Sequence, residues 1–139
     1  MILMHLPDSE VHAALEYLYR SGRFSGVFGV GLSLTVPDDA CTPGSITEVV
    51  ATSYQRVSLA STSAGWAAAA VRAIATIVST TFPAPTDDWG TVLSIPLYDT
   101  TTKATGNLLG AIRFSTGVNV LAGGSAPVIP IGLIRFTAP

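Results

Sequence analysis

Apolar residues alternate with glycine or small polar residues in the segment that begins at residue 25. Of all features of the sequence, this alternation restricts the possible folds most. In the stretch VFGVGLSLTV the alternating apolar positions are Phe28, Val30, Leu32, Leu34 and Val36. Strict alternation predicts a half-buried β-strand, with these side chains on one face of a sheet. Because Gly29 and Gly31 lie on the other face, we expect another segment to pack closely against that face.

The rest of the chain repeats this pattern in short segments separated by loops rich in Gly, Pro and Thr. The expected strands are residues 46–51, 54–59, 66–70, 73–82, 93–97, 108–114, 118–121 and 131–137, with one interrupted strand as the alternative for the first two. Leu93, Ile95 and Leu97 are expected to share one strand face. Pro96 cannot donate to a sheet, so it indicates an edge strand or a bulge. Many short strands predict a mainly β fold, either a β-sandwich or a jelly-roll-like barrel.

The segment AGWAAAAVRAIATIVST, residues 64–80, carries conflicting signals. Its four consecutive alanines favour a helix, because alanine has the highest helix propensity. Its second half is rich in β-branched residues, which favour a strand. We interpret residues 66–70 and 73–82 as strands, and helix stays the alternative for residues 64–71.

One short helix is predicted near the N-terminus, over about residues 8–21. An apolar stripe at helical spacing is formed by Val11, Ala14, Leu15 and Leu18. Pro7 suits the first turn of a helix, and Gly22 supplies the left-handed residue that commonly ends one. With this helix included, residues 1–139 are expected to form a single β-rich domain.

The composition predicts a protein that buries surface against other subunits. Hydrophobic residues make up 48% of the chain and charged residues 12%, and the mean hydropathy is +0.50. A large exposed apolar area does not stay monomeric in water. The seven Lys and Arg residues are scattered and the net charge is −2, which argues against direct binding of nucleic acid.

No segment predicts a membrane span or a secretory signal. The longest apolar run, WAAAAVRAIATIV, contains Arg72 and is too short to cross a bilayer. The first ten residues, MILMHLPDSE, lack the basic start of a signal peptide and reach Pro7 and Asp8 too early. We therefore expect synthesis in the cytoplasm and no membrane partner.

No pattern of residues predicts an enzyme, a metal site or a bound cofactor. The two histidines, His5 and His12, have no acidic residue placed to complete a catalytic or metal site. Asp87 and Asp88 are adjacent rather than spaced as in a calcium loop, so we interpret them as turn residues that bind their own backbone. Cys41 is the only cysteine, which excludes an intramolecular disulfide and predicts an inert loop thiol.

Several motifs, taken in order, resemble a known group of phage proteins. After the predicted helix come VFGVGLSL, TEV followed by SYQRVSLA, FPAPTDDWGTVLSIPLYDT and TGNLLGAIRF. The most specific positions are Phe82, Pro83, Trp89, Gly90, Tyr98, Asp99, Gly106 and Asn107. This order is similar to that of small tailed-phage virion proteins often labelled tail-fibre-like. The similarity spans most of the chain from about Val11.

The resemblance implies a structural virion protein present in many copies. Among such roles we favour a capsid cement or decoration protein on the outer capsid surface. It would bind the major capsid protein and copies of itself, as a trimer, and stabilise the head. The alternatives are a tail component, such as a tail-tube, terminator, fibre or baseplate protein, and a carbohydrate-binding adhesion module.

A glycan is therefore kept as an alternative partner, and it would need exposed aromatic rings beside polar loops. Trp66, Trp89 and Tyr54 are the candidates in this sequence. Trp89 also precedes a glycine at the entry to an apolar strand, which favours a place in the core.

Contacts with other subunits are expected at the N-terminus and in one loop. Residues 1–7, MILMHLP, are expected to form an arm that buries Ile2, Leu3 and Met4 on a neighbouring subunit. A loose terminus is the alternative. The other candidates are Arg23 and the polar loop at residues 37–45, which carries Asp38 and Asp39.

Overall fold

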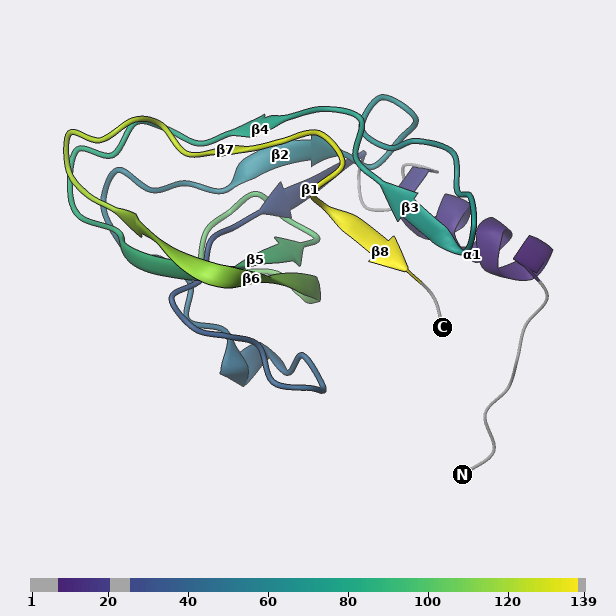
Figure 1. The fold of residues 1–139 in the computed structure, drawn as a ribbon, viewed down its shortest axis with the longest axis horizontal. Helices are drawn as coiled ribbons and strands as arrows, with labels where there is room; N and C mark the ends of the chain where they lie inside the picture. The colour runs from purple at the N-terminus through teal and green to yellow at the C-terminus, as the bar shows by residue number, and fades with distance from the viewer. Residues whose placement is uncertain (1–7, 21–25, 138–139) are drawn as a thin grey trace.

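The computed structural model describes residues 8–20 and 26–137 of the chain (Figure 1). Within these ranges the elements are α1 Asp8–Arg20, β1 Val27–Val30, the short helix η1 Pro43–Ser45, β2 Val57–Ala60, β3 Ala73–Ala75, β4 Thr80–Thr81, β5 Gly90–Tyr98, β6 Leu108–Val120, β7 Val128–Ile129 and β8 Arg135–Thr137. The sheets are antiparallel, and only α1 is a full α-helix among the described residues. The predicted mainly β fold is confirmed, and its arrangement is consistent with a β-sandwich.

Three sheets surround one core. The largest has four strands in the order β2-β1-β5-β6, and β3-β8 and β4-β7 form two-stranded sheets. Figure 1 shows β4 and β7 running along one side of the large sheet, while β3 and β8 lie at the end near α1. The large sheet therefore has β6 as one of its edge strands, on the side away from β2.

Two groups of aromatic rings organise the core. The first consists of Tyr19, Phe28, Trp66 and Phe136, with ring centroids 4.8–6.1 Å apart. The second consists of Tyr54, Phe82 and Trp89, with centroids 5.4–6.4 Å apart. The predicted core position of Trp89 is confirmed, because only 3% of this residue is exposed.

The predicted helix is confirmed as α1, although its buried face differs from the expected stripe. Leu15 is buried, while Ala14 is exposed. Tyr19, which the stripe left out, stacks on Phe136 with ring centroids 4.8 Å apart. Glu16 accepts a hydrogen bond from the Ala69 N–H, so the last turns of α1 dock on the segment before β3.

The close approach expected at Gly29 and Gly31 is also confirmed, although only Gly29 lies within β1. A β-carbon built at Gly29 would lie 1.9 Å from the Thr100 carbonyl oxygen, and one at Gly31 would lie 3.0 Å from the Tyr54 hydroxyl. The strand itself is shorter than expected, since it ends at Val30. Past this point the chain still pairs locally, through bridges from Ser33 to Glu48 and Ser94.

Three other expected strands are shorter than predicted. Residues 46–51 form only the bridge at Glu48, and residues 54–59 correspond to β2 Val57–Ala60. The expected strand at 131–137 is reduced to β8 Arg135–Thr137.

Pro96 lies on an interior strand, so the edge-strand interpretation is wrong. β5 pairs with β1 on one side and with β6 on the other. Pro96 accepts a hydrogen bond from the Gly31 N–H at 2.9 Å and has no N–H to return. The bulge alternative is closer, because register shifts occur on both sides of Pro96, between Val92 and Ser94 and between Leu97 and Tyr98.

The first of these shifts changes which residues of β5 face the core. The register jumps from Val92↔Val118 to Ser94↔Arg113, so Leu93 stands opposite residues 114–117. Val92 is therefore buried with Ile95 and Leu97, and the expected shared face with Leu93 is wrong. The expected gap between the strands at 108–114 and 118–121 falls at this irregularity, although β6 is continuous through it.

The ambiguous alanine-rich segment is a β-hairpin and not a helix. Ala70 and Ala73 exchange backbone hydrogen bonds of 2.9 Å in both directions, and Trp66 bridges Thr76. The expected strand at 73–82 is interrupted, with only β3 and β4 assigned within it. At the hairpin tip Val71 and Arg72 have φ angles of +49° and +58°. This two-residue turn requires left-handed backbone, which a β-branched valine adopts only with strain.

We expect Val71→Asn to stabilise the protein by about 1 kcal/mol, because asparagine tolerates the left-handed region that valine resists. The measurement is the urea unfolding midpoint of the purified protein. Val50→Asn is the matched control, since Val50 is 85% exposed against 83% for Val71 and does not have a positive φ. An equal gain in both variants would show that the effect comes from lower surface hydrophobicity and not from the turn.

Candidate functional site

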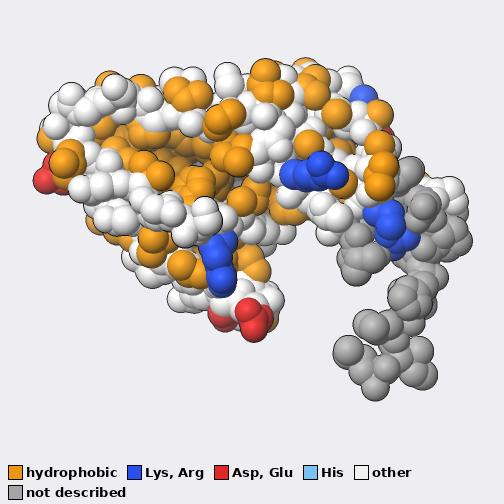
Figure 2. All heavy atoms as spheres, in the orientation of Figure 1, with side chains coloured by type: hydrophobic (Ala, Val, Ile, Leu, Met, Phe, Trp, Pro, Cys, Tyr) orange, Lys and Arg blue, Asp and Glu red, His pale blue; other side chains and the backbone are white. Residues whose placement is uncertain are grey.

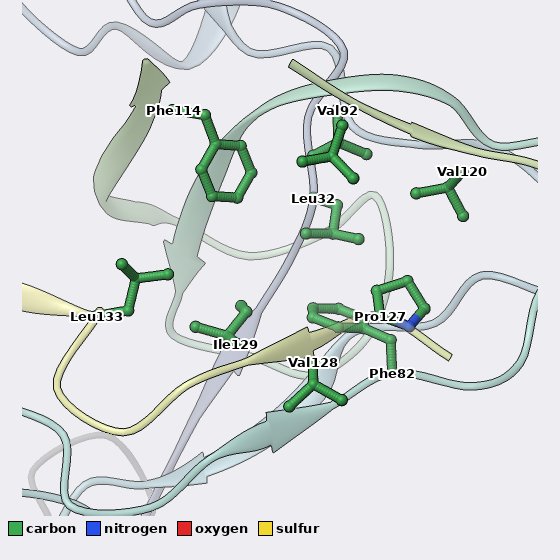
Figure 3. Close-up of a pocket in the computed structure, with 10 residues that line it drawn as sticks. Leu32, Phe82, Val92, Phe114, Val120, Pro127, Val128, Ile129 and Leu133 are labelled. Atoms are coloured by element: carbon green, nitrogen blue, oxygen red, sulfur yellow. The ribbon is translucent and has the colours of Figure 1, made fainter. Parts of the chain in front are cut away.

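A concave apolar groove lies between β6 and β7 and is the main candidate for an interaction site. It encloses about 190 Å³ and is lined by Leu32, Phe82, Val92, Phe114, Val118, Val120, Pro127, Val128, Ile129 and Leu133. Figure 2 shows it as a hollow with hydrophobic side chains at its base, and Figure 3 shows how its lining residues converge from several strands. No lining residue carries a charge or a polar side chain.

The groove exists because two sheets approach on this side without pairing. β6 belongs to the four-stranded sheet and β7 to the β4–β7 pair. Val118 and Val120 point into the groove from β6 because they alternate with Asn119, and Val128 and Ile129 contribute from β7.

The walls of the groove are substantially exposed to solvent. Val118, Val128 and Leu133 are 50%, 55% and 43% exposed. Leu121, which follows Val120 in the chain, and Ile131, between Ile129 and Leu133, are also exposed. Exposed apolar side chains that gather around one hollow make it a candidate interaction site, because apolar surface is costly to leave in water.

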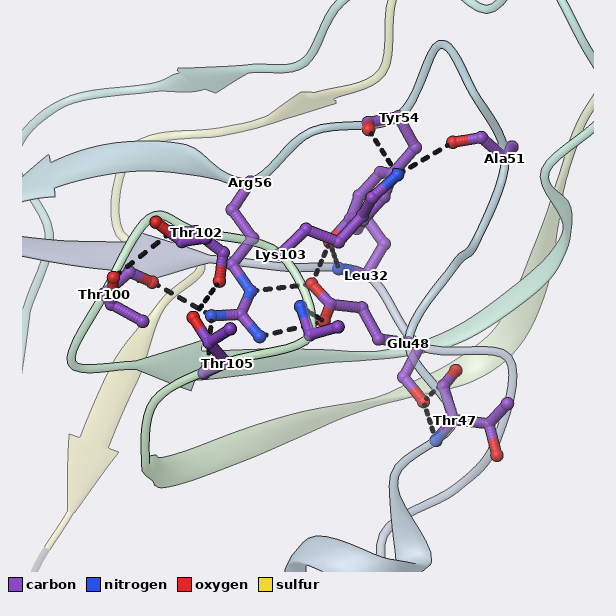
Figure 4. Close-up of polar contacts among 12 residues, drawn as sticks. Leu32, Thr47, Glu48, Ala51, Tyr54, Arg56, Thr100, Thr102, Lys103 and Thr105 are labelled. Carbon is purple, nitrogen blue, oxygen red and sulfur yellow. Dashed lines mark hydrogen bonds and ion pairs between the residues drawn. The ribbon is translucent and has the colours of Figure 1, made fainter.

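A polar cluster centred on Glu48 and Arg56 is the other prominent group of side chains (Figure 4). The Arg56 guanidinium donates to both carboxylate oxygens of Glu48, at 2.7 and 2.8 Å. It also donates to the carbonyl oxygens of Thr100 and Thr105, at 3.0 and 2.8 Å. Its carbon Cζ lies 3.5 Å from the ring centroid of Tyr98. Arg56 is only 6% exposed, so these contacts compensate a buried charge.

Tyr54 completes this cluster and connects it to the segment that follows β1. Its hydroxyl donates to Glu48 Oε1 and accepts from the Leu32 N–H, both at 2.9 Å. Burial, together with the nearby Glu48 charge, raises the pKa of Tyr54, which keeps the phenol neutral and able to donate. Lys103 Nζ donates to the carbonyl oxygens of Ala51 and Tyr54. The side chains of Glu48, Tyr54, Arg56 and Lys103 thus hydrogen-bond to one another and to nearby backbone. We infer that the cluster stabilises the packing of these loops.

The cluster predicts acid sensitivity. Burial of the Glu48 carboxyl raises its pKa, but hydrogen bonds from Arg56, Tyr54 and the Ala104 N–H outweigh this effect and hold the pKa below its usual value of 4.5. A lowered pKa in the folded state stabilises the protein above the unfolded value, and this stabilisation is lost as the pH falls through the folded pKa. We expect the free energy of unfolding to decrease below pH 4.5.

Urea unfolding at neutral pH and at several lower values measures this effect. Glu48→Gln is the informative variant, since it removes the titrating carboxyl and should give a shallower dependence on pH. Hydrogen-bonded Asp38, Asp87 and Asp99 also have lowered pKa values and add a dependence of the same sign. An unchanged slope in Glu48→Gln would assign the acid sensitivity to these three residues.

The candidate interface residues fall into two sets. Ile2, Leu3, Met4 and Arg23 lie outside the described residues. Asp38 and Asp39 are exposed in the loop before η1. Asp38 accepts hydrogen bonds from the Thr42 N–H at 2.7 Å and the Thr42 hydroxyl at 2.6 Å, so it shapes its own loop. Both aspartates remain accessible, and their contact role stays a prediction.

Seven of the eight motif residues have structural roles that hold the fold together. Phe82 and Trp89 are buried in the core, and the Arg56 guanidinium covers the Tyr98 ring. Asp99 accepts hydrogen bonds from the N–H and side-chain amide of Asn107, at 2.7 and 2.8 Å. Positive φ angles occur at Gly90 and Gly106. Pro83 is exposed just after β4.

The adjacent aspartates also bind distant backbone, in contacts that the interpretation as turn residues did not include. Asp87 accepts from the N–H groups of Thr52 and Ser53 at 2.7 and 3.1 Å and from the Ser53 hydroxyl. Asp88 accepts from the Ala122 N–H at 2.8 Å. The two carboxylates thus hydrogen-bond the loop before β5 to two others: Asp87 to the loop at Thr52 and Ser53, and Asp88 to the loop after β6. Across residues 8–20 and 26–137 no group of three His, Cys, Asp or Glu residues is arranged to hold a metal ion.

The aromatic residues proposed for a glycan site are buried. Trp66 and Tyr54 are 0% exposed and Trp89 is 3% exposed. These rings cannot stack on a sugar without unfolding of the core around them. No helix in the described part of the chain is long and apolar enough to cross a membrane. Burial raises the pKa of the Cys41 thiol, with a smaller contribution from Asp38, which disfavours the reactive thiolate.

Sequence reasoning missed both the groove and the Glu48–Arg56 pair as sites. Glu48, Tyr54 and Arg56 stand within the TEV and SYQRV motifs, and charged residues are scarce in this chain. A charge inside an apolar strand pattern is a signal for a buried ion pair, because such charges are buried only when paired. The groove residues carry no comparable signal, since their apolar alternation is the same as that of any core strand.

Comparison with known proteins supplies a family. No curated protein matches the chain. A family model described as "Podophage GP4 fiber I protein gp80" matches residues 12–137, which covers almost all of the described structure. The resemblance to tail-fibre-like virion proteins is thereby confirmed. The chain belongs to the family of podophage GP4 fiber I protein gp80, a family of structural proteins of the tailed-phage virion.

Proposed function

We propose that this protein is a repeated structural subunit of a fibre on a tailed-phage virion, which assembles with copies of itself. The open apolar groove is the observation that supports this role. Only 12% of the residues are charged, and covering the groove with a partner would remove apolar side chains from water, which is energetically favourable. The family description names a fibre, and for this reason we place the tail-component alternative first.

A capsid cement protein, the role favoured from the sequence, would also need an apolar contact surface. The groove is therefore compatible with both roles: a cement protein that binds the major capsid protein and a fibre subunit that binds copies of itself. The trimeric state expected from the resemblance is part of the same proposal. The buried state of Trp66, Trp89 and Tyr54 removes the residues on which a glycan-binding role would depend.

Purified virions provide the test. The copy number of this protein is measured relative to the major capsid protein, and labelled antibodies locate it by electron microscopy. We expect a copy number well below that of the major capsid protein and label confined to fibres. Label spread evenly over the capsid, at a copy number close to that of the major capsid protein, would instead establish a cement protein.

A further inference from the structure

The shape of the groove indicates what kind of partner fills it. Two copies related by a twofold axis would bring identical surfaces together, and a concave surface does not fill its own image. A slender convex partner, such as an extended segment of chain, fits a narrow apolar groove between two strands (Figure 3). Side chains of such a segment would occupy the space above Leu32, Val92 and Phe82.

One wall of the groove also offers backbone hydrogen bonds. β6 pairs with β5 along one edge and is the last strand of its sheet, so its other edge is unpaired within the described residues. An extended segment laid against this edge would add a strand to the sheet and direct alternate side chains into the groove. Main-chain pairing would then supplement apolar burial.

The chain carries a segment of matching chemistry at its start. Residues 1–6 are MILMHL, which contains no Asp, Glu, Lys or Arg. In an extended conformation alternate side chains share a face, so Ile2, Met4 and Leu6 would all point to the same side. Six extended residues span about 20 Å, which is sufficient to follow a groove wall of several residues.

The position of α1 decides which copy receives this segment. The last turn of α1 is fixed to the body of the protein by the bond from Arg20 Nε to the Trp66 carbonyl oxygen, at 3.1 Å. Asp8 lies at the other end of a 13-residue helix, about 18 Å further along its axis. Figure 1 shows the start of α1 at the opposite end of the molecule from the loop that joins β6 to β7. A segment that returned to its own groove would have to retrace the helix and then cross the body.

We propose that residues 1–6 of one copy occupy the β6–β7 groove of a neighbouring copy. Each copy offers one segment and one groove, so the exchange either closes within a small oligomer or continues from copy to copy. This inference rests on the proposed self-association, but it specifies a contact that self-association alone does not require.

Deletion of residues 1–6 is the first test, with oligomeric mass measured by analytical ultracentrifugation. We expect the complete chain to associate, and the deletion variant to be monomeric at the same concentration. Val118→Glu, which places a charge in the groove on a half-exposed side chain, should have the same effect. Val50→Glu is the matched control, since Val50 is exposed and does not line the groove, and it should leave association unchanged.

A direct binding measurement complements the masses. A fluorescent peptide of residues 1–8 with a solubilising tag is titrated into the deletion variant and into the deletion variant carrying Val118→Glu. We expect at least about tenfold weaker binding to the second protein, equivalent to about 1.4 kcal/mol. Equal binding to both proteins would overturn the proposal.

Cross-linking distinguishes exchange between copies from binding within one copy. In a Cys41→Ser background, Met4→Cys, on the face expected to enter the groove, is placed on a chain with one tag and Val128→Cys, which lines the groove, on a chain with another. We expect a disulfide between the two tagged chains after mixing, and none when Val50→Cys replaces Val128→Cys. A chain carrying both cysteines that links only within itself would overturn the exchange. Association that survives the deletion but not Val118→Glu would also overturn it, while leaving self-association and the virion role in place.

Discussion

Replacing Arg56 with alanine should lower the free energy of unfolding by about 4 kcal/mol, because it leaves the Glu48 carboxylate partly buried without its ion-pair partner. The bonds lost include both contacts to Glu48 and those to the Thr100 and Thr105 carbonyl oxygens. Arg56 is 6% exposed, so water does not readily replace them. Chemical denaturation at neutral pH measures the effect.

A double variant separates the ion pair from simple loss of packing. Arg56→Met keeps much of the side-chain volume, and Glu48→Gln removes the facing charge. We expect each single variant to be clearly destabilised, and the double variant to be less destabilised than the sum of the two, because no unpaired charge remains. Arg135→Ala is the control on an exposed arginine, with an expected change within about 0.5 kcal/mol. A loss in Arg56→Ala no larger than in this control would show that the buried cluster contributes little.

The cluster matters for assembly because of the segments it joins. Glu48 and Arg56 lie on either side of the loop that approaches Asp87, and Arg56 reaches the Thr100 and Thr105 carbonyls in the loop between β5 and β6. The β5–β6 hairpin provides Val92, Val118 and Val120 of the groove. A rigid hairpin presents the groove in one conformation, so less entropy is lost when a partner binds.

Local signals predicted the parts of the fold that depend on neighbouring residues. The helix at 8–21 corresponds to α1, Trp89 is in the core, and Gly29 and Gly31 mark a close approach of other chain segments. In each case the signal lies within a few residues: helical spacing, an aromatic before a strand, or glycine in an alternating pattern. Such signals do not depend on which strands later pair.

The errors share a different cause, which is dependence on distant partners. Pro96 is interior because β1 and β6 both pair with β5, and Leu93 leaves the core because β6 has extra residues opposite it. Asp87 and Asp88 bind backbone 34 or 35 residues away in sequence. The groove exists because the four-stranded sheet and the β4–β7 sheet lie side by side without pairing. No short window of sequence contains this information.

Gly29→Ala should be almost as damaging as loss of Arg56, with an expected cost of about 3 kcal/mol. A β-carbon at this position would lie 1.9 Å from the Thr100 carbonyl oxygen and 2.7 Å from its carbon. The obstacle is backbone and cannot move aside by a change of rotamer. Gly29 is also held between two strands, opposite Ser58 of β2 and Tyr98 of β5, so its own backbone has little freedom to shift.

Gly44→Ala is the matched control, because no atom lies within 4 Å of a β-carbon built there, and its stability should change by less than about 0.5 kcal/mol. The Thr100 carbonyl that obstructs the new methyl group also accepts a hydrogen bond from Arg56, at 3.0 Å. Displacing this carbonyl therefore weakens the Arg56 cluster as well. Thermal and urea unfolding of Gly29→Ala, Arg56→Ala and the double variant should give a combined loss smaller than the sum of the single losses. Strict additivity would mean that the strand relaxes around the methyl group without moving Thr100, and the close approach at Gly29 would then be independent of the cluster.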